Sequence, residues 1–511
     1  MRNLVTGLLI ACLVFCAGLA SAAPETIRIL HVNDFHGHAD PMVLPGHNEP
    51  IGGAAWLARR IEELRAEKPT LVLAAGDMIQ GDSWANLTEG ESVIRLMNAV
   101  GFTAMCLGNH EFDFGQKVLT ERIAQAGFPV LAANVTGVPG VQPYIVTSAG
   151  GIRIAIIGLV TDSTPVTSHP RNTAGLAFAS PSATLHNLLP ELRRRADLVV
   201  ALTHLGHSVD LELAREFPDG LVIVGGHSHT RVEKPVKVGG SVVVQAWEHG
   251  KVLGVLDLTL DSGKIVAVDG RLEEIRPEPG RDDPVVAAIV GQYDKLVESR
   301  LGEKVAVAGV DLSDEGVRRQ ETPVGDLVAD IVRQEAGADV ALLNGGSIRT
   351  GLRAGPVTAR DIYAMLPFKN YVVAVRMTGR QLRAAIEHGL SAVEQEEGRF
   401  PQVSGLEIVW SRSSPSGKRC REIRVKGAPL DNDRFYSVAT IDFLAAGGDG
   451  YSSFGEAIRA SGDFAEVGGV LQGSRIVFSD PGHWLRDLVI DRLRKERTIS
   501  PPSDHRIREI P

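Results

Sequence analysis

Short apolar segments that alternate with helical patterns constrain the fold of this chain more than any other feature. Between Thr26 and Leu260 the apolar segments read IRILHV, LVLAAGD, AMCLGN, VLAAN, IRIAIIGLV, LVVALTH, LVIVGGH and SVVVQAW. Brief continuous apolar runs of this kind are typical of strands buried on both faces. The intervening stretches GGAAWLARRIEELRAEK and ESVIRLMNAV place their apolar residues on one helical face. Alternating strands and helices predict an α/β fold.

The pattern changes at RPEPGRDDP, residues 276–284, where proline and charge mark a boundary. The next stretch, VVAAIVGQYDKLVESRL, predicts one amphipathic connecting helix. A second α/β region follows, with helices predicted in VGDLVADIVRQEA and GRQLRAAIEHGL and strands in VALLN and FYSVATIDFL. Since 511 residues are too many for one ordinary core, we predict two domains, with the tail after Pro501 partly loose. The predicted units are a first domain at 24–283, a linker helix at 284–304 and a second domain at 305–511.

The first 22 residues have the pattern of a secretory signal peptide. Arg2 precedes an apolar stretch from Leu4 to Ala20, and small residues surround a cleavage site after Ala22. A retained membrane anchor is the alternative, but the stretch is short for a bilayer and Pro24 interrupts it. We therefore predict an exported protein, periplasmic or extracellular, with no stable membrane anchor.

Charge and cysteine content narrow the class further. A net charge of -9 argues against binding to nucleic-acid polymers, and 44% hydrophobic with 23% charged residues is a globular composition. Cys12 and Cys16 belong to the signal segment, which leaves Cys106 and Cys420. We expect two buried free thiols, with a disulfide as the open alternative. No sequence pattern indicates an oligomeric state.

Polar side chains follow five of the predicted strands, in the motifs NDFHGH, AGDMIQG, LGNHEFD, THLGH and GGHSHT. Because ligands bind beyond the carboxyl ends of strands in an open α/β sheet, these side chains are expected to meet at one edge. D-x-H and H-x-H place two ligands on one side of an extended backbone. Carboxylate, imidazole and amide ligands suit a pair of divalent cations that clamp a reacting phosphoryl group. The candidate ligands are Asp34, His36, Asp77, Asn109, His204, His227 and His229.

Taken in order, these motifs resemble those of the calcineurin-like metallophosphoesterases, and NDFHG, GNHEFDFG and THLG resemble the 5'-nucleotidase branch. The resemblance covers nearly all of the chain after residue 22. It implies an N-terminal four-layer αββα sandwich and a smaller C-terminal α/β domain that binds nucleotide. It also implies two divalent metal ions, whether zinc, manganese, cobalt, iron or magnesium.

The family's residue roles can be placed on the matching positions. One ion would be held by Asp34, His36, Asp77 and His229, and the other by Asp77, Asn109, His204 and His227. Some relatives carry glutamine at the position of His229. The resemblance implies that His110 faces the phosphate and that Asp113 orients it through a hydrogen bond. Glu111 is expected to serve the structure of its own loop.

Three loops of the second half, NGGSIR, LPFKN and FLAAGGDGY, resemble the nucleoside site of the same family. The resemblance implies that Phe368 and Phe443 stack the base, that Asp449 binds the ribose hydroxyls and that Arg349 contacts the phosphate side. Asn344, Gly346 and Asn370 would contact the nucleoside. A further family arginine matches Arg318, although the loop reads T-P-V-G where the family has T-N-M-G, and Arg319 is the alternative.

The sequence as a whole therefore predicts an exported phosphohydrolase that releases phosphate from nucleoside 5'-monophosphates, with di- and triphosphates or nucleotide sugars as further substrates. One alternative is a 2',3'-cyclic-nucleotide phosphodiesterase with 3'-nucleotidase activity, in which tyrosines tend to replace the two phenylalanines. A thiosulfate-ester hydrolase is a second, and an exported nucleotide-binding protein without turnover is a third. Two sites on two domains also predict a hinge near residues 284–305.

Overall fold

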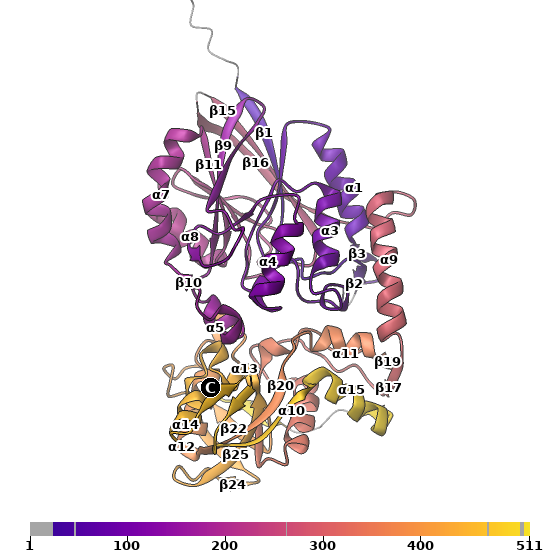
Figure 1. The fold of residues 1–511 in the computed structure, drawn as a ribbon, viewed down its shortest axis with the longest axis vertical. Coiled ribbons are helices and arrows are strands. Elements are labelled where there is room, and N and C mark those ends of the chain that lie inside the picture. The colour runs from indigo at the N-terminus through magenta and orange to yellow at the C-terminus, as the bar shows by residue number, and fades with distance from the viewer. Residues whose placement is uncertain (1–23, 45–46, 262, 468–469, 501–504) are drawn as a thin grey trace, which may run out of the picture.

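The computed structural model describes residues 24–44, 47–261, 263–467, 470–500 and 505–511. The predicted signal peptide therefore lies outside the described residues. Figure 1 shows two α/β domains one above the other, with helix α9 (Pro284–Leu301) running down one side between them. Within the described residues, no helix is both long enough and apolar enough to cross a bilayer.

The N-terminal domain contains two six-stranded sheets that pack face to face. The first has the order β16-β15-β1-β4-β5-β6 and the second the order β13-β14-β12-β11-β9-β8. The strands of the first are β1 (Glu25–Val32), β4 (Thr70–Ala74), β5 (Ala104–Cys106), β6 (Val130–Leu131), β15 (Val252–Asp261) and β16 (Lys264–Glu274). Those of the second are β8 (Tyr144–Ala149), β9 (Ile152–Val160), β11 (Leu198–His204), β12 (Val222–Gly225), β13 (Val236–Val238) and β14 (Ser241–Gln245).

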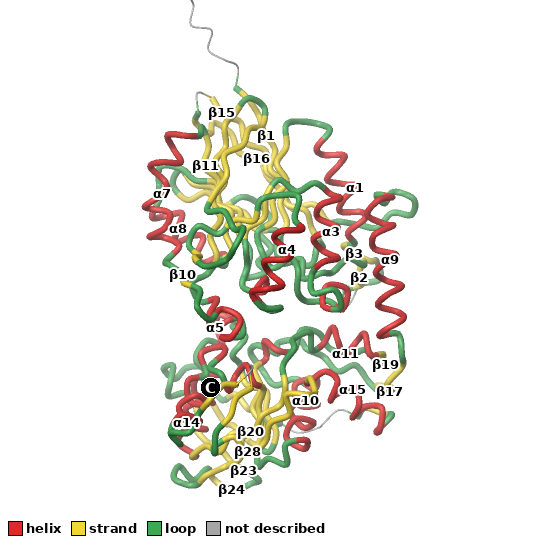
Figure 2. Tube along the Cα trace, viewed as in Figure 1, coloured by secondary structure: helices red, strands yellow, loops and turns green. Residues whose placement is uncertain are grey.

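Three apolar layers stabilise this domain, one between the two sheets and one on the outer face of each sheet. Ile29 of the first sheet and Val200 of the second belong to one core between the sheets. The outer face of the second sheet packs on α7 (Pro181–Arg195) and α8 (His207–Glu216). The outer face of the first sheet packs on α1 (Ala54–Arg65) and α3 (Glu91–Val100), and α9 packs on these two helices. Figure 2 shows the strands enclosed by helices on both sides, which confirms the predicted αββα sandwich.

Most predicted elements lie where the sequence pattern placed them. In α1 the buried residues include Leu57, Ile61 and Leu64, the predicted apolar face. The segment VLAAN is an exception, because its strand β6 ends at Leu131. The next two amides turn away to Gln142 and Gly158 on other segments.

The C-terminal domain is built on a mixed five-stranded sheet of order β21-β18-β25-β20-β28. Its strands are β18 (Val340–Asn344), β20 (Tyr371–Thr378), β21 (Pro401–Ser404), β25 (Phe435–Ile441) and β28 (Ile476–Trp484). Helices α10 (Pro323–Glu335) and α12 (Gly379–Gly389) are the two that the sequence pattern predicts. Thr378 caps α12 in a capping box with Gln381, which explains why the helix begins there.

The C-terminal tail is more ordered than its polar sequence suggests. Strand β30 (Ile507–Glu509) pairs in parallel with β22 (Leu406–Trp410). Arg506 is buried and its guanidinium donates to the carbonyl of Val403 at 2.9 Å. The prediction of a loose tail is therefore wrong for these residues.

Helix α9 has a buried face along its length. Its buried residues are Val286, Ile289, Tyr293, Val297 and Leu301. The hydroxyl of Tyr293 donates to Glu91 at the start of α3 at 2.6 Å. The connecting helix is therefore part of the N-terminal domain's surface layer as well as a link between domains.

Candidate functional site

Five of the seven predicted ligands follow their strands in a strained backbone conformation rather than in the extended one that the D-x-H and H-x-H spacing predicts. Asp34, His36, Asp77, His227 and His229 all have positive φ, between 49° and 81°. Non-glycine residues seldom adopt this left-handed region, and strain of this kind concentrates at functional sites. The tight turns bring each side chain back towards the edge shared by the two sheets.

Glycines let these turns approach one another. A Cβ added to Gly108 would lie 2.2 Å from Oδ1 of Asp77, and one added to Gly76 would lie 2.5 Å from Nδ1 of His204. No side chain fits at either position. These glycines therefore let the neighbouring loops approach closely.

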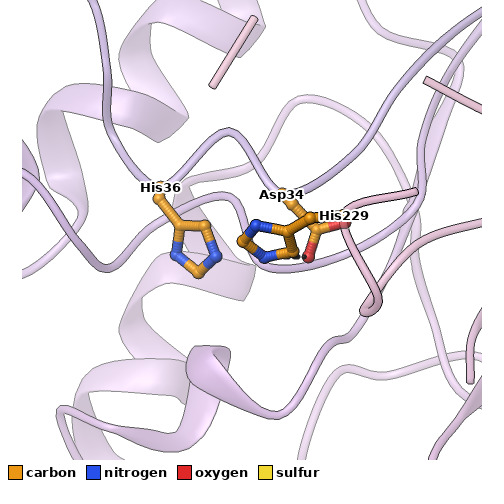
Figure 3. A group of neighbouring side chains, drawn as sticks. All are labelled: Asp34, His36 and His229. Atoms are coloured by element: carbon orange, nitrogen blue, oxygen red, sulfur yellow. Dashed lines mark ion pairs between the residues drawn. The ribbon is translucent and has the colours of Figure 1, made fainter. Parts of the chain in front are cut away.

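Asp34, His36 and His229 form the first group of candidate ligands, with ligand atoms all within 4.8 Å of one another. Nε2 of His229 lies 3.2 Å from Oδ1 of Asp34. Figure 3 shows the His229 ring and the Asp34 carboxylate facing each other, with His36 beside them. Nδ1 of His36 bonds the carbonyl of Gln80 at 2.7 Å, which leaves its Nε2 for an ion.

Asp77, His204 and His227 form a second group of the same kind. Nε2 of His204 lies 3.0 Å from Oδ2 of Asp77, and Nδ1 bonds the carbonyl of Ala75 at 2.7 Å. Burial opposes protonation of His204, but the Asp77 carboxylate raises its pKa to about 10. Burial and the neighbouring His204 lower the pKa of His227 to about 3. Asp77 also lies 3.9 Å from Nε2 of His36, so it faces both groups.

These residues fit a pair of divalent cations. Nε2 of His36 and Oδ1 of Asn109 are buried and have no hydrogen-bond partner among the described residues. Leaving such atoms unpaired is costly unless something else satisfies them. Asn109 directly precedes His110, whose backbone N–H donates to Asp77 at 2.8 Å. Oxygen and nitrogen donors in this mixture suit zinc, manganese, iron, cobalt or magnesium.

Glu111 ties the two central ligand loops together. Its buried carboxylate accepts backbone N–H bonds from Asp77 at 2.8 Å, Met78 at 2.7 Å, Ile79 at 3.3 Å and Gly108 at 2.6 Å. Burial and the nearby Asp77 carboxylate raise the pKa of Glu111 to about 7. The residue therefore supports loop structure, as predicted.

His110 lies between Asp113 and the C-terminal domain. Its Nδ1 is 2.6 Å from Oδ2 of Asp113, and its Nε2 is 2.7 Å from Nη2 of Arg349. Because an arginine can only donate, Nε2 accepts here and Nδ1 carries the proton that Asp113 accepts. The structure thus brings the predicted pair together and adds Arg349 to it.

The three C-terminal loops lie close to this position. The Phe368 ring has its centroid 5.7 Å from that of His110, and the Arg349 guanidinium lies 5.1 Å from the Phe368 centroid. Phe443 has different neighbours, with its centroid 6.2 Å from the ring of His169. Both phenylalanines are half-buried.

The polar residues of these loops also gather. Nδ2 of Asn344 donates to Asp449 at 2.7 Å, and burial raises the pKa of the Asp449 carboxyl. Asp449 has a positive φ of 50°. Gly346 lies so close to Gly398 that an added Cβ would be 2.8 Å from its Cα. Asn370 is buried directly before β20, and its carbonyl accepts from Leu485 at 2.8 Å.

Arg318 lies nearer this site than its alternative. Arg319 is exposed and bonds Glu396 at 2.9 Å. Burial and the positive charge of Arg318 lower the pKa of Arg349 to about 10, and the Arg318 charge also acts on Asp449. Of the two arginines, Arg318 is therefore the one that accompanies the cluster.

The sequence reasoning missed Glu248 and His249, in the turn after β14. Nδ1 of His229 bonds Glu248, and His229, Glu248 and His249 form a third group of close ligand atoms. The His249 ring lies 3.9 Å from that of His38. No motif matches this turn, although the segment AWEHG directly follows a buried strand, as the other ligand loops do.

Cys106 and Cys420 are free thiols in the structure. Cys106 is buried in the core between the sheets, whereas Cys420 is half-buried. The prediction of free thiols is confirmed, and that of burial holds for Cys106.

Two family models match this chain. The model described as calcineurin-like phosphoesterase matches residues 27–231, and that described as 5'-nucleotidase, C-terminal domain, matches residues 303–456. Together with the fold and the ligand loops, they define a two-domain metallophosphoesterase, a class that requires divalent metal ions.

Individual relatives agree. The chain is 30% identical to the Protein UshA of Yersinia enterocolitica over 83% of this chain and 86% of that one. It is 30% identical to the trifunctional nucleotide phosphoesterase protein YfkN of Bacillus subtilis over 95% of this chain, but spans 35% of that longer protein. The crystal structure of a 5'-nucleotidase precursor from Thermus thermophilus matches with a TM-score of 0.83 and 33% identity, over 95% and 99% of the two chains. The chain belongs to the 5'-nucleotidase family and is a phosphoric monoester hydrolase.

Proposed function

We propose that this protein is an exported enzyme that releases phosphate from nucleoside 5'-monophosphates. The observation that carries the proposal is the contact between domains. Arg349 and Phe368 of the C-terminal domain lie against His110 of the N-terminal domain, at 2.7 Å and 5.7 Å. A site that places an aromatic ring and an arginine beside the candidate metal ligands suits a phosphate ester with a flat base.

In this proposal the metal ions are held by the two ligand groups, with Asn109 beside the second and Asp77 facing both. Two divalent ions bound there would polarise a phosphoryl group and lower the pKa of bound water. Arg349 moves its donors from His110 to the phosphate oxygens as substrate enters. His110, held by Asp113 through Nδ1–H, would then take up a proton at Nε2 and donate it to the phosphate or the leaving ribose oxygen.

The nucleoside half of the substrate is assigned to the C-terminal loops. Phe368 and Phe443 stack the base, and Asp449 accepts from the ribose hydroxyls while Asn344 holds its carboxylate. Gly346 and Asn370 line the same loops, and Arg318 adds positive charge on the phosphate side. Two phenylalanines rather than tyrosines favour a 5'-monophosphate over a 2',3'-cyclic nucleotide.

The test is phosphate release from a panel of AMP, ADP, UDP-glucose and 2',3'-cyclic AMP, with and without chelator. Asp77→Ala is expected to abolish turnover. Phe443→Ala is expected to raise KM for AMP while Phe435→Ala, which removes an exposed phenylalanine of the same domain, leaves KM unchanged. Release from 2',3'-cyclic AMP at a rate similar to that from AMP would favour the phosphodiesterase instead, and AMP binding without turnover would favour a binding protein.

We also propose that residues 1–22 direct export and are removed after Ala22. The mass of the protein recovered from the periplasm or medium tests this, since cleavage gives a mature chain that begins at Ala23. Full-length protein retained in the cytoplasm would contradict the proposal.

A further inference from the structure

The turn after β14 is tied to both ligand loops of the first candidate group. Trp247 and His249 have positive φ values of 53° and 58°. The amide of His249 donates to the carbonyl of Asp34 at 2.8 Å, and Asn33 donates to the carbonyl of Trp247 at 2.6 Å. A conformation that L residues seldom adopt is thus held in place by the loop that carries Asp34.

The turn presents the carboxylate of Glu248 to His229. One carboxylate oxygen bonds Nδ1 of His229, and the other accepts from Nζ of Lys251 at 2.5 Å. The opposite ring nitrogen, Nε2, lies 3.2 Å from Oδ1 of Asp34. One edge of the ring therefore meets a carboxylate and the other edge meets the candidate metal ligands.

We infer that Glu248 is a positioning residue for the metal centre, which holds His229 in the Nδ1–H tautomer and aims its Nε2 lone pair at the first ion. The inference rests on the proposed metal centre. Histidine ligands generally need such a partner, because a ring that can rotate or exchange tautomers offers its lone pair only part of the time. A glutamine at position 229 would bind an ion through its amide oxygen and would have no ring tautomer for Glu248 to fix.

The alternative to this positioning role is a third metal site at His229, Glu248 and His249. The position of Lys251 argues against it. The Lys251 ammonium already neutralises Glu248, and it lies 4.2 Å from the centroid of the Trp247 ring. A divalent ion bound there would stand beside that ammonium, and like charges at this range repel. The protein should therefore bind two ions and not three.

The experiment is a double-mutant cycle read by metal affinity. Glu248→Ala, His229→Gln and the double variant are stripped of metal and titrated with Mn²⁺ against a chelator, and the bound ions are counted by elemental analysis. Glu248→Ala is expected to lower the affinity for the first ion by about 10–100-fold. In the His229→Gln background the same change is expected to have a much smaller effect, because an amide has no tautomer for Glu248 to fix. Glu248→Gln, whose amide oxygen still accepts from Nδ1–H, is expected to recover much of the loss.

Glu233→Ala is the matched control, because it removes an exposed carboxylate of the neighbouring segment and should leave both affinities unchanged. Thermal unfolding of the metal-free variants checks the fold, and Glu248→Gln carries the comparison if Glu248→Ala unfolds. An equal loss in both backgrounds would overturn the inference, as would a third ion in the wild type that disappears with Glu248. A wild type that binds no ion would overturn it together with the metal centre.

The proposed function can fail separately. A wild-type protein that binds two ions but releases no phosphate from AMP would refute the proposed activity, while the affinity cycle would still show whether Glu248 acts through His229.

Discussion

Replacing Glu111 by glutamine isolates the cost of the contact that joins the two central ligand loops. The substitution keeps the size of the side chain and removes one acceptor oxygen. In the native structure one oxygen accepts from Asp77 and Gly108, and the other accepts from Met78 and Ile79. Whichever way the new amide is oriented, its NH₂ group faces two backbone donors.

The expected loss of stability follows from the number of backbone donors that are left unpaired. A buried donor left without a partner costs about 1–3 kcal/mol, so two of them cost about 2–6 kcal/mol in total. For a domain of this size, about 1 kcal/mol lowers Tm by about 2–4 °C, which gives a fall of about 4–24 °C. The distorted loops should also bind metal more weakly, because they carry Asp77 and Asn109.

The assay is thermal unfolding of chelator-treated protein, so that lost metal does not contribute to the shift. Glu121→Gln is the control, because Glu121 is an exposed glutamate on the nearby helix α4 (Gln116–Gln125) and should shift Tm by about 1 °C or less. A Tm for Glu111→Gln within 1 °C of the wild type would refute the reasoning, since it would mean that the four amides have other partners.

Three further predictions concern other parts of the molecule. Arg349→Ala should lower kcat for AMP by about 10²–10³, and Arg349→Lys should restore little of it, because an ammonium does not reproduce the planar fork; steady-state kinetics measure both. Burial lowers the pKa of His31 to about 4 in the folded protein, whereas the unfolded chain keeps a value of about 6.5. The free energy of unfolding should therefore rise by about 3 kcal/mol as the pH rises from about 4 to 6.5. His31→Leu should flatten that slope, as measured by urea unfolding. Asp442 bonds Nε2 of His169 and Nη1 of Arg171 across the domain contact, both at 3.2 Å. Asp442→Asn should therefore loosen the contact and raise the radius of gyration in X-ray scattering. An unchanged radius would show that other contacts suffice to hold the two domains together.

The fold could be predicted from sequence where apolar periodicity acts over several residues. Seven of the eight apolar segments of the first half and the apolar face of α1 needed no tertiary information. The short strand β6 and the docked tail did not follow from pattern alone. Whether Ala132 continues strand β6 depends on the position of Gln142, whose carbonyl accepts from the Ala132 amide. Strand β30 forms because it can pair with β22.

The ligand loops could be predicted because each one follows a strand in the same sheet-edge position. Glu248 obeys the same rule, yet a lone glutamate after a strand has no partner visible in the sequence. Its role depends on the His229 ring lying within hydrogen-bonding distance, 19 residues away in the chain. Likewise, the choice between Arg318 and Arg319 depends on which one a neighbouring glutamate captures, and that glutamate is Glu396.

The contact between Arg349 and His110 bears on how the two domains cooperate. In the present arrangement His110 has Asp113 on one side and an arginine from the other domain on the opposite side. In the proposed reaction a phosphate would compete for that arginine, so substrate entry would exchange a contact between domains for a contact with ligand. Helix α9 is anchored by its buried residues and packs mainly on α1 and α3 of the N-terminal domain, so rotation of the domains would centre on the residues after Leu301 rather than within the helix. That assignment narrows the predicted hinge from 22 residues to the few that follow Leu301.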